Sequence, residues 1–105
     1  MSSDAHTHFH HPGIILRDLY LAEMGFSQTT VAKATGIPQS RLSEICAGRR
    51  GISADTALRL GKFFDVDPQG FINLQTHYDL AEAKAAFEAK RPREKIIPCS
   101  QLQTA

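Results

Sequence analysis

The apolar positions between Pro12 and Lys90 recur every three or four residues, which is the spacing of amphipathic α-helices. No stretch shows the strict alternation of a half-buried strand. Glycine and proline divide the pattern into five segments, and we expect helices at about residues 13–24, 28–35, 39–47, 54–64 and 68–90. The sequence therefore predicts an all-α fold with one domain over residues 12–90 and a long last helix.

Residues suited to helix ends support these boundaries. Ser27 and Ser53 stand before apolar runs as N-caps. Gly25 ends the first predicted helix, and Gly36 ends the second. The last segment leaves room for a break near residues 75–77.

Both ends of the chain lack this periodicity. Residues 1–11 are polar and carry four of the five histidines, so we expect a flexible arm there. Residues 91–105 contain Pro92 and Pro98 and are expected to form a flexible polar tail.

The segment 28–45 has the pattern of a helix-turn-helix. Two short helices joined by a three- or four-residue turn cross steeply, so they need a small residue at their closest approach and a turn residue that tolerates positive φ. Ala32 and Gly36 meet these needs, whereas Thr35 stands where an aliphatic residue is more usual. The apolar residues expected to fill the wedge are Val31, Ile37, Leu42 and Ile45. The alternative is an ordinary helical bundle, which leaves the polar surface of the second helix unexplained.

Short polar side chains occupy the outer positions of the predicted helix 39–47. Glutamine can bond to adenine, arginine to guanine and serine to either, so such a helix can read base edges in the major groove of DNA. The expected base-reading residues are Gln39, Ser40, Arg41, Ser43 and Glu44. For Glu44 a second interpretation stays open, in which it pairs with Arg41 on the helix surface.

Phosphate contacts are expected on both sides of this helix. Amides at the start of the helix 28–35 suit a phosphate, and basic residues after the helix 39–47 would lie beside the same DNA backbone. The expected phosphate-binding residues are Ser27, Gln28, Lys33, Arg49 and Arg50, with Arg17 and Arg59 as extensions. The whole chain has a formal charge of only +1, so one copy should bind weakly and with strong salt dependence. A dimer that reads two half-sites would overcome this weakness.

With these elements placed, the chain resembles the HigA- and VapI-type antitoxins, which carry a lambda-repressor-like (XRE-type) helix-turn-helix. The matching blocks are residues 11–16, 36–45, 50–60 and 73–75. The resemblance implies a five-helix DNA-binding domain that dimerises and represses its own operon through a palindromic operator upstream of it. It also implies a HigB-like toxin as partner, a RelE-like mRNA endonuclease. Ile14 and Gly70 depart from the family pattern, and glycine at 70 should weaken the start of the last helix by about 1 kcal/mol relative to alanine.

The last predicted helix carries more apolar groups than one covered face needs. The expected dimer-contact residues are Leu74, Tyr78, Leu80, Ala81 and Phe87. The alternative is that all of them cover the core of a single copy.

The remaining reactive residues indicate neither catalysis nor a cofactor. The cluster His6, His8, His10 and His11 is interpreted as adventitious metal binding, because a folded metal site needs rigid ligands and a supporting shell. No phosphate-binding glycine loop, metal-binding helix motif or Ser/His/Asp set is present, so we expect no enzyme activity. Cys46 is expected to be a packing residue.

Two cysteines are too few for a disulfide framework, and no apolar run approaches the roughly 20 residues that span a bilayer. We therefore expect a cytoplasmic protein with no membrane contact. Two rival functions stay open. One is a free-standing helix-turn-helix transcriptional regulator without a toxin partner, and the other is a protein-interaction module that has lost DNA binding.

Overall fold

The computed structural model of the chain describes residues 11–90 and 95–102. Its helices are α2 (Pro12–Ile15), η1 (Leu16–Leu21), α3 (Ala22–Met24), α4 (Gln28–Thr35), α5 (Gln39–Cys46), α6 (Ala54–Phe64), α7 (Gln69–Lys90) and η2 (Cys99–Gln101). The first three follow one another directly and form one helix whose middle, η1, is π-helical. The described residues contain no strand, so the predicted all-α fold with five main helices is confirmed.

The predicted helix ends are largely confirmed by the capping contacts. The Ser27 hydroxyl accepts a hydrogen bond from the Thr30 amide at 3.1 Å, and the Ser53 hydroxyl accepts one from the Thr56 amide at 3.3 Å. Gly36 ends α4 in the left-handed conformation, with φ of 80°. α5 ends at Cys46, one residue earlier than expected.

The core lies where the first helix, α4, α5, α6 and the start of α7 meet. Its largest fully buried apolar side chains are Leu16, Val31, Leu42, Ile45, Leu60 and Phe71. Gly13 marks a close approach of two helices, because a Cβ there would overlap the backbone carbonyl of Ile45. α2 can therefore pack directly on α5 and fix its position.

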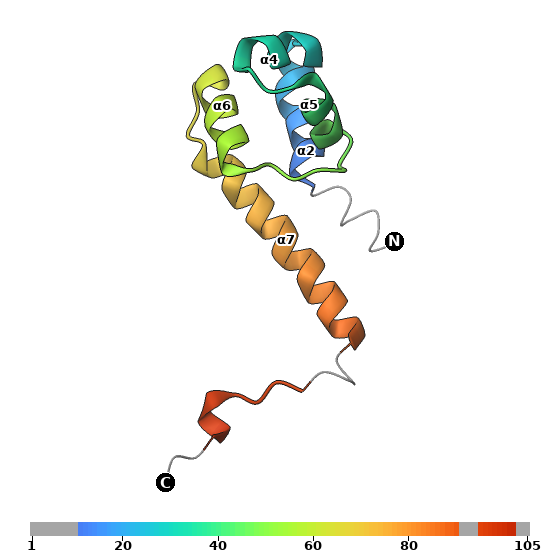
Figure 1. Cartoon of the computed structure of the whole chain (residues 1–105), viewed down its shortest axis with the longest axis vertical. Helices are drawn as coiled ribbons and strands as arrows, with labels where there is room; N and C mark the ends of the chain where they lie inside the picture. The colour runs from blue at the N-terminus through green and yellow to red at the C-terminus, as the bar shows by residue number, and fades with distance from the viewer. Residues whose placement is uncertain (1–10, 91–94, 103–105) are drawn as a thin grey trace.

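Figure 1 shows the helices from α2 to α6 gathered into a head, from which α7 projects as a straight rod. The first turns of α7 pack on α2 and α6, and Phe71 is buried there. Every residue from Asp79 to Lys90 is exposed. The break considered near residues 75–77 is absent, because the Gln75 amide donates to the Asp79 carboxylate one turn later, at 2.8 Å.

The boundary of the N-terminal arm differs from the prediction by one residue. His11 is only 5% exposed, and its Nδ1 accepts a hydrogen bond from the Gly13 amide at 2.8 Å. Its ring also lies 4.8 Å from that of Tyr78, centroid to centroid. His11 is thus the N-cap of α2, because its side chain satisfies an amide that the first turn leaves without a partner.

The rest of the predicted arm, with His6, His8 and His10, lies outside the described residues. Within the predicted tail, residues 95–102 are described and include the short helix η2. Three large apolar side chains are exposed there, namely Ile96, Ile97 and Leu102, so the tail is less polar than expected.

Candidate nucleic-acid interface

The α4–α5 pair forms the predicted helix-turn-helix frame. Val31, Ala32, Ile37, Leu42 and Ile45 are all buried, as the wedge requires. Because these side chains fill the space between the two helices, α5 is held rigidly on the surface of the head.

Thr35 serves the turn through hydrogen bonds, in place of the aliphatic packing that is more usual there. Its hydroxyl donates to the Val31 carbonyl at 2.7 Å and accepts from the Ile37 amide at 3.2 Å. The guanidinium of Arg59 donates to the Thr35 carbonyl at 2.9 Å. The turn is therefore tied to α6 as well as to α4.

The outer side of α5 presents polar groups that nothing in the described part of the chain engages. Gln39, Ser40 and Ser43 are exposed, and Arg41 is half-buried. At 100° per residue these four positions span one outward half of the helix, opposite Leu42, Ile45 and Cys46. They remain available to bond to a ligand in front of α5.

Glu44 does not follow the second interpretation left open by the sequence, in which it pairs with Arg41. Its Oε1 accepts from the Nε of Arg50 at 2.7 Å, so it pairs with an arginine six positions later. The reason is the reversal of the chain after α5, which brings Arg50 back along the helix. A carboxylate has two oxygens, so a contact of the other one with cytosine stays a prediction.

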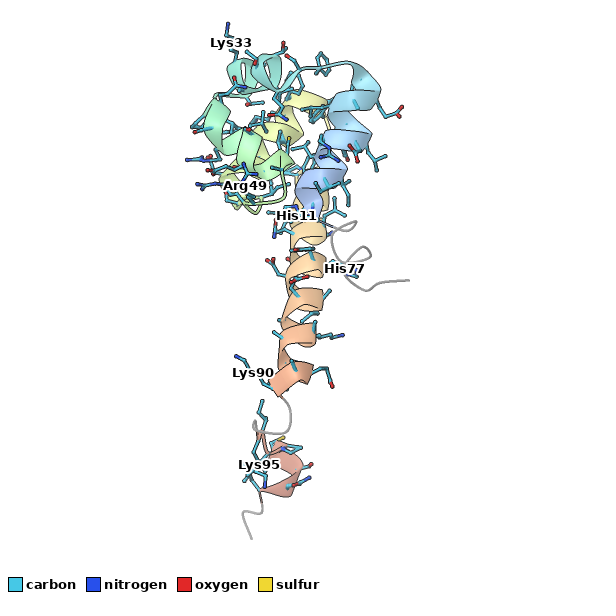
Figure 2. All side chains as sticks on the ribbon, turned by 90° about the vertical axis from the view of Figure 1, so that its right-hand side faces the viewer. His11, Lys33, Arg49, His77, Lys90 and Lys95 are labelled. Carbon is cyan, nitrogen blue, oxygen red and sulfur yellow. The ribbon has the colours of Figure 1, made fainter. Side chains whose placement is uncertain are left out.

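The start of α4 and the loop after α5 flank this polar surface. The Ser27 hydroxyl is used as the cap of α4, while the first amides of the helix have no intrahelical acceptor. Lys33 and Arg49 are exposed, and Gln28 is half-buried. Figure 2 shows Lys33 at the end of the head farthest from α7, and Arg49 on its flank nearer to α7.

Ion pairing engages three arginines of the described residues, Arg17, Arg50 and Arg59. Arg17 is paired with Asp18 at 2.8 Å and Arg59 with Asp55 at 2.9 Å, so both proposed extensions of the footprint are engaged elsewhere. The hydrogen bond to Asp18 raises the pKa of Arg17, and the same bond lowers the pKa of Asp18. Lys33, Arg41 and Arg49 have no carboxylate partner within residues 11–90 and 95–102.

The five residues expected at a dimer contact are divided by the structure. Leu74 and Tyr78 are half-buried against the head, whereas Leu80, Ala81 and Phe87 are exposed on the projecting half of α7. The alternative that all five cover the core of one copy is therefore wrong. The cause is the direction of α7, which leaves the head after about three turns.

From the sequence, His11 is expected in the flexible arm and Gln75 has no role, whereas the structure has both residues joining elements of the head. Gln75 accepts a hydrogen bond from the Ile52 amide at 2.7 Å. Both residues lie in blocks that resemble the antitoxin family, 11–16 and 73–75, but their contacts depend on the folded chain.

Other kinds of site find no support among the described residues. Within them, no group of three or more His, Cys, Asp or Glu side chains is placed to hold a metal ion. The same residues include no helix long and apolar enough to cross a bilayer. A hollow of about 430 Å³ between α4 and α6 is lined by Leu58, Lys62 and Phe63 among others, on a different part of the head from the outer side of α5.

Comparison with known proteins agrees with this geometry. The sequence pattern of the helix-turn-helix family matches residues 16–71. The chain is 49% identical over 90 residues to virulence-associated protein I of Dichelobacter nodosus, a match that covers 86% of this chain and 81% of that protein.

Two solved structures are similar over most of their length. The Pseudomonas aeruginosa antitoxin HigA, solved with the higBA promoter, has a TM-score of 0.77 and 43% identity, covering 84% of this chain and 95% of that one. The antitoxin GraA in complex with its operator has a TM-score of 0.69 and 39% identity, covering 84% of this chain and 91% of that one.

Proposed function

This chain belongs to the helix-turn-helix family of DNA-binding antitoxins and regulators, with HigA- and VapI-type relatives, and on that premise we propose that it is an antitoxin that represses its own operon. In this role it binds a palindromic operator upstream of the operon as a homodimer. It also neutralises a HigB-like toxin, a RelE-like mRNA endonuclease encoded beside it.

The observation that carries DNA binding is the free polar surface of α5. The side chains of Gln39, Ser40, Arg41 and Ser43 have no hydrogen-bond partner in the described part of the chain, and they stand on a helix fixed by buried apolar contacts. Side chains of this kind bond to base edges, and a rigid helix presents them without further ordering. The similar proteins HigA and GraA are solved with a promoter and an operator, which supports the same use of this surface.

The flanking groups have distinct roles in this proposal. The capped N-terminus of α4, with Ser27 and Gln28, receives a phosphate through its amides. Lys33 and Arg49 contact the DNA backbone on either side. Arg50 supports α5 through Glu44 and adds charge near the same phosphates, while the second carboxylate oxygen of Glu44 is proposed to accept from a base.

The modest charge and the exposed half of α7 support the proposed dimer. The few unpaired cations beside α5, Lys33, Arg41 and Arg49, give weak, salt-dependent binding, and two linked copies on two half-sites multiply it. The exposed apolar residues Leu80 and Phe87 offer a surface for the second copy.

Footprinting on the DNA upstream of the gene, at low salt, tests the DNA-binding part. Arg41→Ala is expected to reduce the discrimination between operator and random DNA by roughly 1–3 kcal/mol, as for loss of a guanine contact. The matched control is Arg17→Ala, which removes an exposed arginine engaged by Asp18 and should leave discrimination unchanged. An unaltered footprint for Arg41→Ala would contradict its role as a base reader.

Co-expression tests the antitoxin part. The protein encoded by the adjacent reading frame should copurify with this chain and should be toxic when expressed alone. If the adjacent frame encodes no such protein while the footprint is retained, the chain is a free-standing regulator. If the footprint is lost and a partner protein copurifies, it is an interaction module.

A further inference from the structure

We propose that Gln75 of α7 is a positioning residue for DNA binding, because it holds the loop between α5 and α6 in the conformation that presents Arg49 to the phosphate backbone. The loop comprises residues 47–53. This inference rests on the proposed DNA-binding function and assigns a role in it to a residue outside the helix-turn-helix.

Gln75 contacts the loop through its side-chain oxygen and through the flat face of its amide. Its Oε1 accepts a hydrogen bond from the amide of Ile52, 23 positions earlier in the chain, at 2.7 Å. Its side-chain amide lies so close over Gly51 that a Cβ there would meet the Cδ, Nε2 and Oε1 atoms at 3.0 Å. The loop backbone is therefore pressed against α7.

The orientation of the Gln75 amide is itself fixed. Its Nε2 donates to the Asp79 carboxylate at 2.8 Å, so the oxygen must point to the Ile52 amide. Ile52 is 3% exposed, and its amide has no water to replace Gln75 as acceptor. A side chain without an acceptor at position 75 would leave this amide unsatisfied and release the second half of the loop.

The first half of the loop is held by α5. The amides of Gly48 and Arg49 each donate at 2.9 Å, to the carbonyls of Ile45 and Glu44. Arg49 is thus anchored on α5 by its own amide and lies three residues before the α7 anchor at Ile52, with its side chain exposed on the flank of the head (Figure 2). An arginine on a loop fixed at both ends loses less freedom when it binds a phosphate.

Binding to a random-sequence duplex at increasing salt tests the inference, since phosphate contacts dominate such binding. Arg49→Ala should reduce the slope of log K against log salt by about 1, the value for one phosphate contact. Gln75→Ala should weaken binding by about 3–10-fold and reduce the slope in the same direction. Because both changes act on one contact, the double variant should bind about as weakly as Arg49→Ala alone.

Two control variants separate positioning from a general effect on folding. Gln75→Glu combined with Asp79→Asn reverses donor and acceptor between the two side chains, keeps an acceptor for the Ile52 amide and leaves the net charge unchanged. This pair should restore the binding lost in Gln75→Ala. Asn73→Ala removes another side-chain bond of α7, to Gln69 at 3.1 Å, and should not affect binding.

Amide hydrogen exchange gives a readout that needs no DNA. In Gln75→Ala the amide of Ile52 should exchange faster, while that of Arg49 and those of α5 and α6 remain protected. Unchanged exchange in the loop, or full additivity with Arg49→Ala at an unaltered salt slope, would overturn the inference. If the wild-type chain binds no duplex at all, the proposed function fails instead, and the exchange data still decide whether Gln75 holds the loop.

Discussion

Gly13 and Gly70 are both helical glycines, but their surroundings are opposite. A Cβ on Gly13 would overlap the Ile45 carbonyl, whereas a Cβ on Gly70 would meet nothing within 4 Å. The glycine at position 13 is needed for the contact of α2 with α5, and the one at position 70 only lowers the stability of α7.

Replacing Gly13 and Gly70 by alanine should therefore change the free energy of unfolding in opposite directions. Gly13→Ala forces α2 away from a backbone carbonyl that cannot yield, and we expect a loss of about 3 kcal/mol in the free energy of unfolding, at the upper end of overpacking effects. Gly70→Ala should increase it by up to about 1 kcal/mol, since alanine favours the helix and reduces the freedom of the unfolded chain. Urea denaturation measures both, and equal stability of the two variants would contradict the close α2–α5 contact.

The two cysteines also differ in their surroundings. Cys46 is 1% exposed in the core, where burial raises the pKa of its thiol, while Cys99 is exposed. In the native protein at neutral pH, a thiol-specific reagent should modify Cys99 within minutes and Cys46 only after denaturation, because the thiolate is the reactive form. Mass spectrometry after digestion checks this, and modification of Cys46 in the native protein would show that the α5 packing opens readily.

The raised pKa of Cys46 also affects how the stability of the protein depends on pH. Above the ordinary thiol pKa, the unfolded chain loses the Cys46 proton while the folded chain keeps it. Stability that depends on this group is therefore lost as the pH rises from the ordinary thiol pKa to the raised pKa of the folded chain, and Cys46→Ser should remove this part of the alkaline dependence.

At the scale of elements, α4 and α6 both begin with a serine N-cap. Ser27 and Ser53 each cap a helix by accepting the amide three positions later. Replacing either serine by alanine should cost about 1 kcal/mol of stability. Only Ser27→Ala should also weaken DNA binding, because only α4 directs its N-terminus to the proposed phosphate. Equal DNA binding by the two variants, compared at matched folded fractions, would exclude the start of α4 from the interface.

The helices themselves could be predicted from the sequence because their signals are local. The cap at Ser27, the glycine at 36 and the apolar spacing of α6 act within one or two turns, and the observed boundaries differ from the predicted ones by one residue at most. The unbroken α7 was less evident, since the bond from Gln75 to Asp79 that supports its middle is one of many available polar pairings.

The contacts that join elements could not be predicted in the same way. Gln75 meets Ile52 from 23 positions away, and Glu44 meets Arg50 only because the chain reverses after α5. For the candidate interface, the outward positions Gln39, Ser40 and Ser43 followed from helical periodicity. The engagement of Glu44, Arg17 and Arg59 in ion pairs depends on side-chain geometry that periodicity does not contain.

At the scale of the whole molecule, the projecting half of α7 is the feature that a single copy does not explain. From Asp79 onward every side chain is exposed, and an isolated helix of this length is marginal in water. Leu80 and Phe87 are seven positions apart and share one side of the helix, while Phe71, nine positions before Leu80, faces the opposite side. A second apolar side thus begins where contact with the head ends.

The second apolar side of α7 provides a test of the proposed dimer. Leu80→Glu and Phe87→Glu together should convert a dimer of the 11.6 kDa chain into a monomer, as seen by light scattering after gel filtration at micromolar protein. Because both residues are exposed in one copy, thermal unfolding of the variant monomer should remain cooperative.

A leucine of the head provides the matched control for this test. Leu58 on α6 is 53% exposed against 55% for Leu80, so Leu58→Glu introduces one of the two added charges at a similar exposure away from α7. The control should remain a dimer, and both proteins should bind a single half-site duplex equally. On the palindromic operator only the α7 variant should lose affinity, because it alone loses the linkage between half-sites. A wild-type chain that is monomeric both free and on the operator would contradict the role given to α7.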